Sequence, residues 1–452
     1  MASKVRIAVV QTLLAWDQER ENEYGLNIFE GRGASFADGR DRAFFKRLTQ
    51  GCIERLIELD YILDAFSKFP MQRQRPILRW ILRVSLYQML YMDSVPDHAI
   101  LSEALGMAVK FGFQGSKSYV NGLLRSILRQ KDQLPYPNFE KNPLLALSVR
   151  ASIPTWILSL WMDSYGLDIV RTMVEQIHTP RPVTVHFLPF VCAQMKEKYL
   201  AQWTALGITY NEAIYPPNAY ELRHLFGVES LPGYEEGAFY VQDPSSALAV
   251  ACAGIRPGDF VVDVCAAPGG KSIRAALLGA HVLARDVNEA KVERIRENIN
   301  RLNLSTLMTI QCFDARTTDN SLYGKADVVL MDVPCSGLGV IQKKPDIKYR
   351  LTKESLPKLI DLAWEIASNS WQYLKPGGTL LYSTCTLNPM ENERMIDRLC
   401  ESFPLERVSL QDCWPQCFPE IRQKTQELCT RTIFPGFYPM DGFFFAKLRR
   451  KK

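Results

Sequence analysis

The sequence predicts a multidomain protein with an all-α N-terminal part, a small α+β middle region and an α/β domain built on a doubly wound, mainly parallel sheet. Three observations support this prediction. The chain has 452 residues, whereas a single domain usually has about 100–200. Apolar residues recur at helical spacing through the first part, and from Gly237 onward short apolar strands alternate with amphipathic helices. We therefore expect domains over residues 1–134, 140–236 and 237–450.

Helical spacing is clearest in the N-terminal part, where no convincing strand is present. One apolar stripe consists of Leu48, Cys52, Leu56, Leu59 and Leu63. Two prolines and an asparagine within residues 134–138 predict a linker after this part. The longest apolar stretch, residues 77–92, contains Arg79 and Arg83, so we expect a buried helix there rather than a membrane span.

The middle region has mixed character, with a helix expected over residues 157–177 and a strand over residues 183–187. In the third part, a helix with one apolar stripe is expected over residues 290–302. The strands expected there are residues 260–264, 282–285, 308–311, 328–331 and 379–382. Ligands bind at the carboxyl ends of the strands in such sheets, so the residues that follow these strands are the candidates for function.

Composition excludes several classes of protein. Apolar residues make up 47% and charged residues 23%, as in soluble globular proteins, which argues against disordered and fibrous proteins. The 11 cysteines include no C-x-x-C pair and the 5 histidines lie far apart, so neither a disulfide framework nor a zinc site is expected. No small-residue cleavage site follows the apolar run near the N-terminus, so we expect a cytoplasmic protein without a signal peptide.

The net charge of +5 says little about partners, but the basic residues are clustered. Two stretches contain no acidic residue; their basic residues are Lys68, Arg73, Arg75, Arg79 and Arg83, and Lys110, Lys117, Arg125, Arg129 and Lys131. Such a run is often only a solvated helix face, and the alternative is contact with RNA phosphates. Two runs in one predicted domain favour RNA contact.

A loop of small residues follows the first strand of the predicted α/β domain. It comprises Cys265, Ala266, Ala267, Pro268, Gly269, Gly270 and Lys271. A phosphate-binding P-loop would need glycine at position 265, and the dinucleotide pattern G-x-G-x-x-G is absent. A nucleoside without a pyrophosphate fits better, since Asp286 can accept both ribose hydroxyls and Asp314 can bind an adenine amino group. S-adenosylmethionine meets this description; a purely structural turn is the alternative.

Two cysteines follow neighbouring predicted strands, Cys335 after the fourth and Cys385 after the fifth, with Asp332 beside Cys335. A single cysteine at a strand end is usually a packing residue, but two beside an aspartate and a cofactor loop indicate chemistry. C5 of cytosine is too weak a nucleophile to take a methyl group until a thiolate adds to C6. Asp332, if protonated, can donate to N3, and the second cysteine can assist release.

With these residues the sequence resembles the sun/NOP2 family of RNA cytosine-5 methyltransferases, whose catalytic domain is a Rossmann-like class I methyltransferase fold. The matching segments are residues 264–271, 332–337, 345–348, 383–386, 389–393 and 441–444. The N-terminal part is similar to NusB-type RNA-binding domains at residues 40–44, 86–88, 95–99 and 119–125. The resemblance covers nearly the whole chain and is weak only over residues 140–235.

The resemblance implies roles for the site residues. Cys385 would be the nucleophile and Cys335 would assist its release. The implied cofactor-binding residues are 265–271, Asp286, Asp314 and Asp332, and residues 242–245 would lead into the catalytic fold. The implied substrate is a cytosine in small-subunit ribosomal RNA.

The chain departs from the family pattern at three places. Val333 and Leu338 stand where the family usually has alanine and threonine, which changes little chemically. Residues 434–440 replace a glycine-rich acidic stretch. This last difference leaves the shape of the target-base pocket, and hence the target nucleotide, open.

Other interpretations are open from the residues alone. A P-loop NTPase would use residues 328–332 as a strand ending in a metal-binding aspartate, but Cys265 and the paired cysteines disfavour it. A non-enzymatic, NusB-like RNA-binding factor would not need both cysteines. Among substrates, transfer RNA is the alternative to ribosomal RNA, and DNA is a more remote one. We expect a monomer without a metal ion or a membrane association.

Overall fold

The computed structural model of the chain describes residues 3–19, 36–225, 227–418 and 429–452. By their internal contacts the residues form two compact units. Unit 1 comprises residues 1–178 and 341–353, and unit 2 comprises residues 179–340 and 354–452. The expected middle region, residues 140–236, therefore contributes to both units, and its status as a domain of its own stays a prediction.

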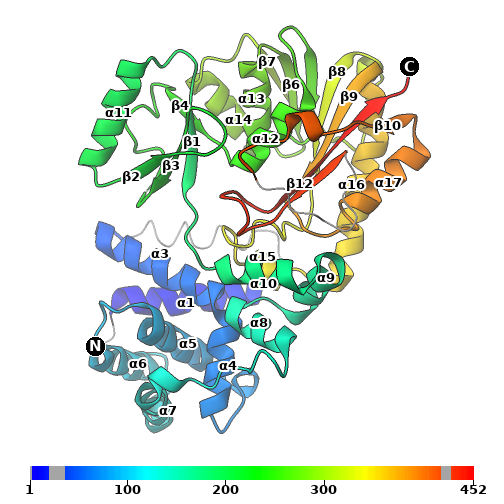
Figure 1. Cartoon of the computed structure of the whole chain (residues 1–452). Helices are drawn as coiled ribbons and strands as arrows, with labels where there is room; N and C mark the ends of the chain where they lie inside the picture. The colour runs from blue at the N-terminus through cyan, green and yellow to red at the C-terminus, as the bar shows by residue number, and fades with distance from the viewer. Residues whose placement is uncertain (1–2, 20–35, 226, 419–428) are drawn as a thin grey trace. The chain divides into compact units, whose positions relative to one another are not determined.

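Up to the predicted linker, the described residues of unit 1 form helices and no strand, as expected. Pro76 opens α5 at a position where its missing N–H costs nothing, and α5 is buried along most of its length. Apolar stripes of other helices, such as Val120 and Leu124 of α7, join the same core. In the described part of unit 1 the α-helices are α1 Lys4–Glu19, α3 Gly39–Glu54, α4 Leu56–Phe66, α5 Pro76–Tyr91, α6 Asp97–Lys110, α7 Lys117–Arg129, α8 Pro143–Ala151, α9 Thr155–Tyr165, α10 Leu167–Gln176 and α15 Ile347–Arg350 (Figure 1).

The single helix expected over residues 157–177 is wrong in one respect. The structure divides it into α9 and α10 at Gly166. Gly166 has φ 87° and ψ 161°, a conformation that is open to glycine and strained for other residues. Apolar spacing continues across this position, so periodicity alone does not reveal the break.

In the described part of the chain, no single helix is long and apolar enough to cross a membrane. Helices α8 and α9 reach the required length and composition only together, and they meet at a bend of 119°. Each buries apolar side chains within the protein, among them Leu147 of α8 and Trp161 of α9.

A segment from the second half of the sequence belongs to unit 1. Residues 341–353 pack there, with Lys348 almost completely buried. The Lys348 Nζ donates to the carbonyl oxygen of Glu54 at 3.0 Å and lies 3.4 Å from that of Ala151. Glu54 and Ala151 are the last residues of α3 and α8. The lysine thus satisfies carbonyls that helix ends leave unpaired, and its charge complements the negative ends of both helices.

This buried lysine predicts a pH dependence of stability. Burial lowers the pKa of Lys348 from 10.5 to about 7. The unfolded chain therefore holds this proton more tightly than the folded chain between about pH 7 and 10.5, and the contribution of Lys348 to the free energy of unfolding rises with pH across that window, by at most about 1.4 kcal/mol per pH unit. In Lys348→Met this contribution should vanish. Urea unfolding of wild type and Lys348→Met at pH 7, 8 and 9 measures the difference between their free energies of unfolding. A difference that does not change with pH would contradict the prediction.

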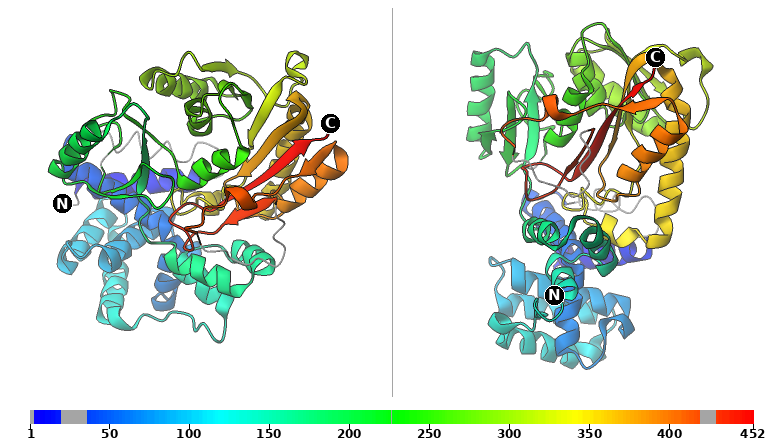
Figure 2. Two further views of the ribbon diagram at one scale, coloured as in Figure 1. Left: turned by 45° about the horizontal axis from the view of Figure 1, so that its top comes forward. Right: turned by 45° about the vertical axis from the view of Figure 1, so that its right-hand side comes forward.

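Unit 2 begins with a small antiparallel sheet of strand order β2-β3-β1-β4. The strand expected at residues 183–187 is present as β1. Helix α11 covers one face of this sheet, as Figure 2 shows, and Phe187 stacks on Trp203 of that helix with 5.5 Å between ring centroids. The elements are β1 Val183–Phe187, α11 Ala193–Ala205, β2 Thr209–Glu212, β3 Ala219–Arg223 and β4 Phe239–Val241.

The larger sheet of unit 2 has the strand order β10-β12-β9-β8-β5-β6-β7, with β11 paired to β12. Strands β5 to β9 are parallel, and β12 runs antiparallel beside β9. All five predicted strands are present. The strands are β5 Phe260–Asp263, β6 His281–Asp286, β7 Met308–Cys312, β8 Ala326–Asp332, β9 Leu374–Thr384, β10 Leu405–Arg407, β11 Thr430–Ile433 and β12 Phe443–Arg450. The chain winds outward from β5 to β7 and returns to β8, so the topological switch point lies between β5 and β8.

Helices cover both faces of this sheet (Figure 1). Val261 of β5 packs with α12, α13 and α14, whereas its neighbour Val262 packs with α16 and α17. A strand buried on both faces is a continuous apolar run, which is why these strands could be predicted. The helices are α12 Pro244–Ala253, α13 Gly270–Leu277, α14 Glu289–Arg301, α16 Leu356–Ser370 and α17 Glu393–Ser402. The predicted fold class is therefore confirmed.

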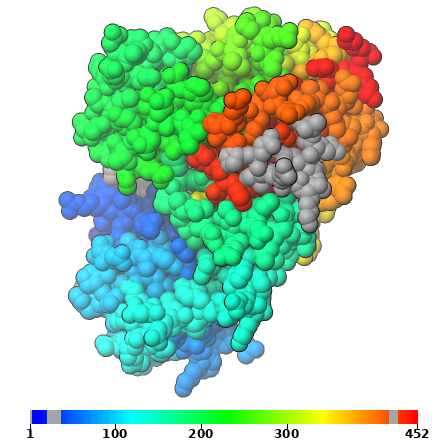
Figure 3. All heavy atoms as spheres, viewed as in Figure 1, coloured from blue at the N-terminus to red at the C-terminus, as the bar shows by residue number. Residues whose placement is uncertain are grey.

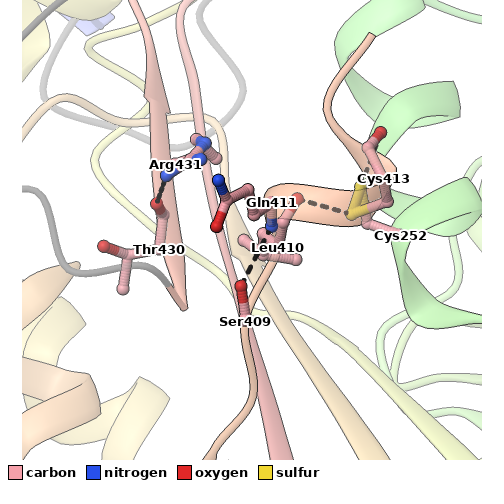
Figure 4. The surroundings of a disulfide bond; sticks show 7 residues. All are labelled: Cys252, Ser409, Leu410, Gln411, Cys413, Thr430 and Arg431. Carbon is pink, nitrogen blue, oxygen red and sulfur yellow. Dashed lines mark hydrogen bonds between the residues drawn. A yellow bond between two sulfur atoms is a disulfide. The ribbon is translucent and has the colours of Figure 1, made fainter.

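One pair of cysteines is linked, although no disulfide framework is expected from the cysteine spacing. Cys252 of α12 and Cys413, in the short helix η7 (Gln411–Cys413), form a disulfide bond (Figure 4). Their Cα atoms are 5.3 Å apart, a usual separation for a disulfide. The two residues are 161 positions apart in the sequence. Their spacing therefore gives no sign of the pairing, which only the fold produces.

Candidate active site

The predicted cysteines come together because β8 and β9 are parallel neighbours. Asp332 at the end of β8 lies opposite Ser383 near the end of β9, so the residues that follow the two strands leave the same edge of the sheet. The sulfur atoms of Cys335 and Cys385 are 3.4 Å apart, and both residues are half-buried. The expectation that adjacent strands bring the two cysteines together is confirmed.

The two thiols are not equivalent. The hydrogen bond with Cys385, together with burial, raises the pKa of Cys335 well above its ordinary value. Either sulfur can be the donor of this hydrogen bond, and Cys335 is the thiol that keeps its proton.

A buried carboxylate holds the residue next to each cysteine. Glu391 is 1% exposed and accepts hydrogen bonds from the Ser336 backbone N–H at 2.7 Å and from the Ser336 hydroxyl. It also accepts from the Asn388 amide at 2.8 Å, and the hydroxyls of Ser336 and Thr386 are 2.6 Å apart. Burial raises the pKa of Glu391 above its ordinary value. This cluster fixes the loops that carry Cys335 and Cys385, and our reading of the individual residues missed it.

Lys271 and Asp332 form an ion pair beside the cysteines. The Lys271 ammonium donates to Asp332 Oδ2 at 2.6 Å, and the Ser383 hydroxyl donates to Asp332 Oδ1 at 2.8 Å. Both carboxyl oxygens therefore accept hydrogen bonds, the pattern of an ionised group. The expected role of Asp332 as a proton donor to N3 stays a prediction. Lys271 also lies 5.0 Å from the centre of the Phe443 ring.

The loop of small residues joins β5 to α13 as expected. Gly269 has φ 105°, which glycine adopts without strain, and α13 starts at the next residue without a side-chain cap. Beneath the loop, the Ser272 hydroxyl donates to Asp263 at 2.6 Å. Burial raises the pKa of Asp263 to about 7. The backbone N–H groups at the start of α13 are thus left for a ligand.

The other predicted cofactor residues follow the next two strands. Asp286 ends β6, and its two oxygens accept from the backbone N–H groups of Ala267 at 3.2 Å and Asn288 at 3.3 Å. Lone pairs remain on both oxygens for further donors. Asp314 follows β7 and pairs with Arg316 at 2.7 Å. This ion pair lowers the pKa of Asp314, and it engages both of its oxygens, which sequence reasoning did not foresee.

These residues fit a nucleoside cofactor. Asp286 suits a pair of ribose hydroxyls, and the next residue, Val287, is 60% exposed and offers an apolar surface to a base. Gln242 Nε2 is buried beside the start of α13 and has no hydrogen-bond partner among the described residues. Such an atom is costly unless a ligand or water completes the site. In the described residues, no group of three or more histidine, cysteine and acidic side chains has an arrangement that could hold a metal ion.

Two glycines let the hairpin formed by β11 and β12 approach the cysteines. The Gly442 backbone N–H donates to the Gly339 carbonyl at 3.0 Å, and the Gly339 N–H donates to the Cys385 carbonyl at 2.9 Å. A Cβ on Gly339 would overlap the Gly442 carbonyl. Asp243, which caps α12, also accepts from the Asp441 N–H at 3.2 Å. The segment around Gly442 is therefore part of the site through its backbone.

The two basic runs of unit 1 are only partly free. Arg79 pairs with Asp17 at 2.9 Å, and Arg83 is nearly buried, where it pairs with Asp60 at 2.6 Å. These two arginines have structural partners, which corrects their inclusion among the RNA-binding candidates. The remaining candidates are Lys68, Arg73, Arg75, Lys110, Lys117, Arg125 and Arg129, which are exposed, and Lys131, which is partly exposed.

Comparisons with known proteins agree with this architecture. Two family models match the chain, 16S rRNA methyltransferase RsmB/F over residues 251–449 and the NusB family over residues 3–129. The chain is 32% identical over 420 residues to the probable ribosomal RNA small subunit methyltransferase B of Bacillus subtilis, and 32% identical over 415 residues to ribosomal RNA small subunit methyltransferase B of Proteus mirabilis. Each match covers 91% of this chain and 91% of the relative. The crystal structure of PH0851 shares the fold, with a TM-score of 0.76 at 21% identity over 100% of both chains.

Proposed function

Since the chain belongs to the ribosomal RNA small subunit methyltransferase B family, we propose that it transfers a methyl group from S-adenosylmethionine to C5 of a cytosine in small-subunit ribosomal RNA. The observation that carries this proposal is the 3.4 Å approach of the Cys335 and Cys385 sulfurs beside the ion pair of Lys271 and Asp332. Methylation at C5 needs one thiol that adds to the ring, a second group that assists release, and a proton donor for the base.

In the proposed reaction the Cys385 thiolate attacks C6 of the cytosine, forming a carbon–sulfur bond and making C5 nucleophilic. S-adenosylmethionine supplies an electrophilic methyl group for C5. Loss of the C5 proton to a base then restores the ring double bond and breaks the bond between C6 and sulfur. Cys335 is assigned to this release step as the neighbouring thiol: its raised pKa keeps it protonated, so it can donate its proton to the departing Cys385 sulfur while a separate base takes the C5 proton.

The proposal gives the donor role at N3, which the sequence analysis expected of Asp332, to the pair of Lys271 and Asp332. Attack at C6 places negative charge on the base, and a donor at N3 would stabilise it. The proton available for this purpose lies between Lys271 and Asp332, whose nitrogen and oxygen atoms are 2.6 Å apart. Asp332 then orients the ammonium, and Ser383 orients Asp332. In this proposal the side chains of Lys271, Asp332 and Ser383 stabilise the negative charge on the base, and the proposal includes no metal ion.

The direct test is methyl transfer by the purified full-length chain to ribosomal RNA, followed by bisulfite mapping of 5-methylcytosine. The proposal expects one modified cytosine in small-subunit ribosomal RNA. The same modification should be missing from the ribosomal RNA of cells that lack the protein. Modification of transfer RNA alone would move the substrate to that class. Methylation at a base nitrogen or at a ribose would overturn the C5 assignment.

Replacement of Asp286 should specifically reduce the affinity for the cofactor. Asp286→Ala removes the carboxylate assigned to the ribose hydroxyls, and a hydrogen bond to a charged group is worth about 1.5–3 kcal/mol. Titration calorimetry with S-adenosylmethionine should show a dissociation constant raised by roughly 10- to 150-fold. Glu293→Ala is the matched control, since Glu293 lies on the following helix with its side chain 56% exposed. Equal affinities for wild type and Asp286→Ala would refute the placement.

A further inference from the structure

We propose that the loop between α4 and α5, together with the start of α7, binds an unpaired stretch of RNA and that Phe69 stacks on one of its bases. The inference rests on the proposed function only in that the substrate is RNA. Phe69 is 63% exposed. The blue segment around the end of α4 lies at the surface at the lower edge of the space-filling view (Figure 3). The functional site described above does not use this surface.

The loop that presents Phe69 is held in one conformation. The Ser67 hydroxyl donates to the Phe69 carbonyl at 2.7 Å and accepts from its N–H at 3.1 Å. The Gln74 amide donates to the same carbonyl at 3.2 Å and to the Tyr119 hydroxyl at 2.6 Å. Met71 is completely buried and anchors the loop in the core. The ring therefore projects from a fixed backbone, so little conformational entropy is lost when it binds a ligand.

Positive charge surrounds this ring. Lys68, Arg73 and Arg75 lie in the same loop and are exposed. Lys117 begins α7, whose Tyr119 hydroxyl is also 2.8 Å from the Ser67 hydroxyl, so the two basic runs meet at this loop. Between positions 68 and 83 there is no acidic residue, and Asp64, just before the loop, already accepts from the Met71 N–H at 2.6 Å.

An exposed aromatic ring among cations that have no ion-pair partner in the described part of the chain fits single-stranded RNA better than other partners. Phosphates of any nucleic acid would satisfy the cations, but a duplex keeps its base faces stacked inside, whereas an unpaired base can stack on an aromatic side chain. A protein interface would need a broader apolar patch than one ring. Arg79 and Arg83 carry none of this role, because Asp17 and Asp60 already neutralise them.

The experiment measures binding of a fluorescent, unstructured pyrimidine 12-mer RNA to the full chain by anisotropy over a range of salt concentrations. Phe69→Ala should weaken binding by roughly 5- to 150-fold, the worth of one stacked base, and should leave the salt dependence unchanged. Phe69→Trp should restore affinity. Arg73→Gln with Arg75→Gln should instead flatten the slope of log affinity against log salt by about 0.7 for each charge removed.

Matched controls separate this surface from general effects. Phe190→Ala removes an aromatic ring of unit 2 that is 55% exposed, and Arg171→Gln removes an arginine of unit 1 whose side chain is 58% exposed; both should bind as wild type does. A blunt RNA duplex should bind Phe69→Ala and wild type equally. Wild-type affinity for the 12-mer in Phe69→Ala would overturn the inference even if methyl transfer is observed. A Phe69-dependent affinity without transfer to C5 would sink the proposed reaction and leave this inference standing.

Discussion

Cys385→Ala and Cys335→Ala should fail at different stages of the reaction. Without Cys385 no thiolate adds to C6, so neither a covalent protein–RNA complex nor methylated RNA should form, and the rate should fall below detection. Without Cys335 addition and methyl transfer should proceed, and release should stall. Cys335→Ala should therefore accumulate a protein–RNA adduct that survives denaturing electrophoresis, with the RNA already methylated.

The physical basis is that addition at C6 needs the Cys385 thiolate and the donor at N3, whereas release needs proton removal from C5 and cleavage of the bond between C6 and sulfur. Cys335, which keeps its proton 3.4 Å from the sulfur of Cys385, is placed to protonate that sulfur as it leaves C6. An adduct formed by Cys385→Ala instead would reverse the two roles. If neither variant nor wild type forms an adduct with RNA that contains 5-fluorocytosine, the covalent mechanism is wrong for this protein.

Gly339→Ala should abolish methyl transfer and destabilise unit 2. The added Cβ would overlap the Gly442 carbonyl and lie 2.8 Å from the Cys385 carbonyl oxygen. Both neighbours are backbone atoms, so the loop of Cys385 or the hairpin at Gly442 has to move. Overpacking of this kind costs about 1–3 kcal/mol or more, and a displaced cysteine loop loses the geometry that the reaction needs. Thermal unfolding and methyl transfer measure the two effects.

Gly122→Ala is the matched control for this substitution. Gly122 lies inside α7, and a Cβ there would meet nothing within 4 Å. Alanine in an exposed helix interior is more favourable than glycine by about 0.5–1 kcal/mol. This variant should be slightly more stable than wild type and fully active. Wild-type activity in Gly339→Ala would show that the contact between the cysteine loop and the hairpin is unnecessary.

Much of the fold could be predicted because parallel strands buried on both faces are continuous apolar runs. The residues after those strands then follow from topology, which is why the sequence predicts Cys335, Cys385, Lys271 and Asp286 as one site. Cys335 and Cys385 do lie together at one sheet edge. Their chemical roles stay predictions until the variants are measured.

What the sequence could not reveal depends on contacts between distant positions. Arg83 in a basic run looks free until Asp60 is found beside it. Glu391 looks like one more acidic residue until the fold buries it against Ser336. Asp332 looks like an isolated acid until the Lys271 ammonium, 61 positions away in the sequence, is found 2.6 Å from it. Each is a pairing in space, for which periodicity and motif spacing carry no signal.

The path of the chain between the two units bears on how the protein can be divided. The backbone passes from one unit to the other after residues 178, 340 and 353, so neither unit is encoded by one uninterrupted stretch. A fragment that ends at residue 178 would lack Lys348 and Tyr349, which donate hydrogen bonds to backbone carbonyls at the C-terminal ends of α3 and α8. Conversely, a fragment that starts at residue 179 would carry residues 341–353 without the helices that bury them. The N-terminal helices therefore do not form a domain that can be separated from the rest of the chain. If the gene is split after residue 178, each half should be poorly soluble alone, and both should fold only when they are produced together.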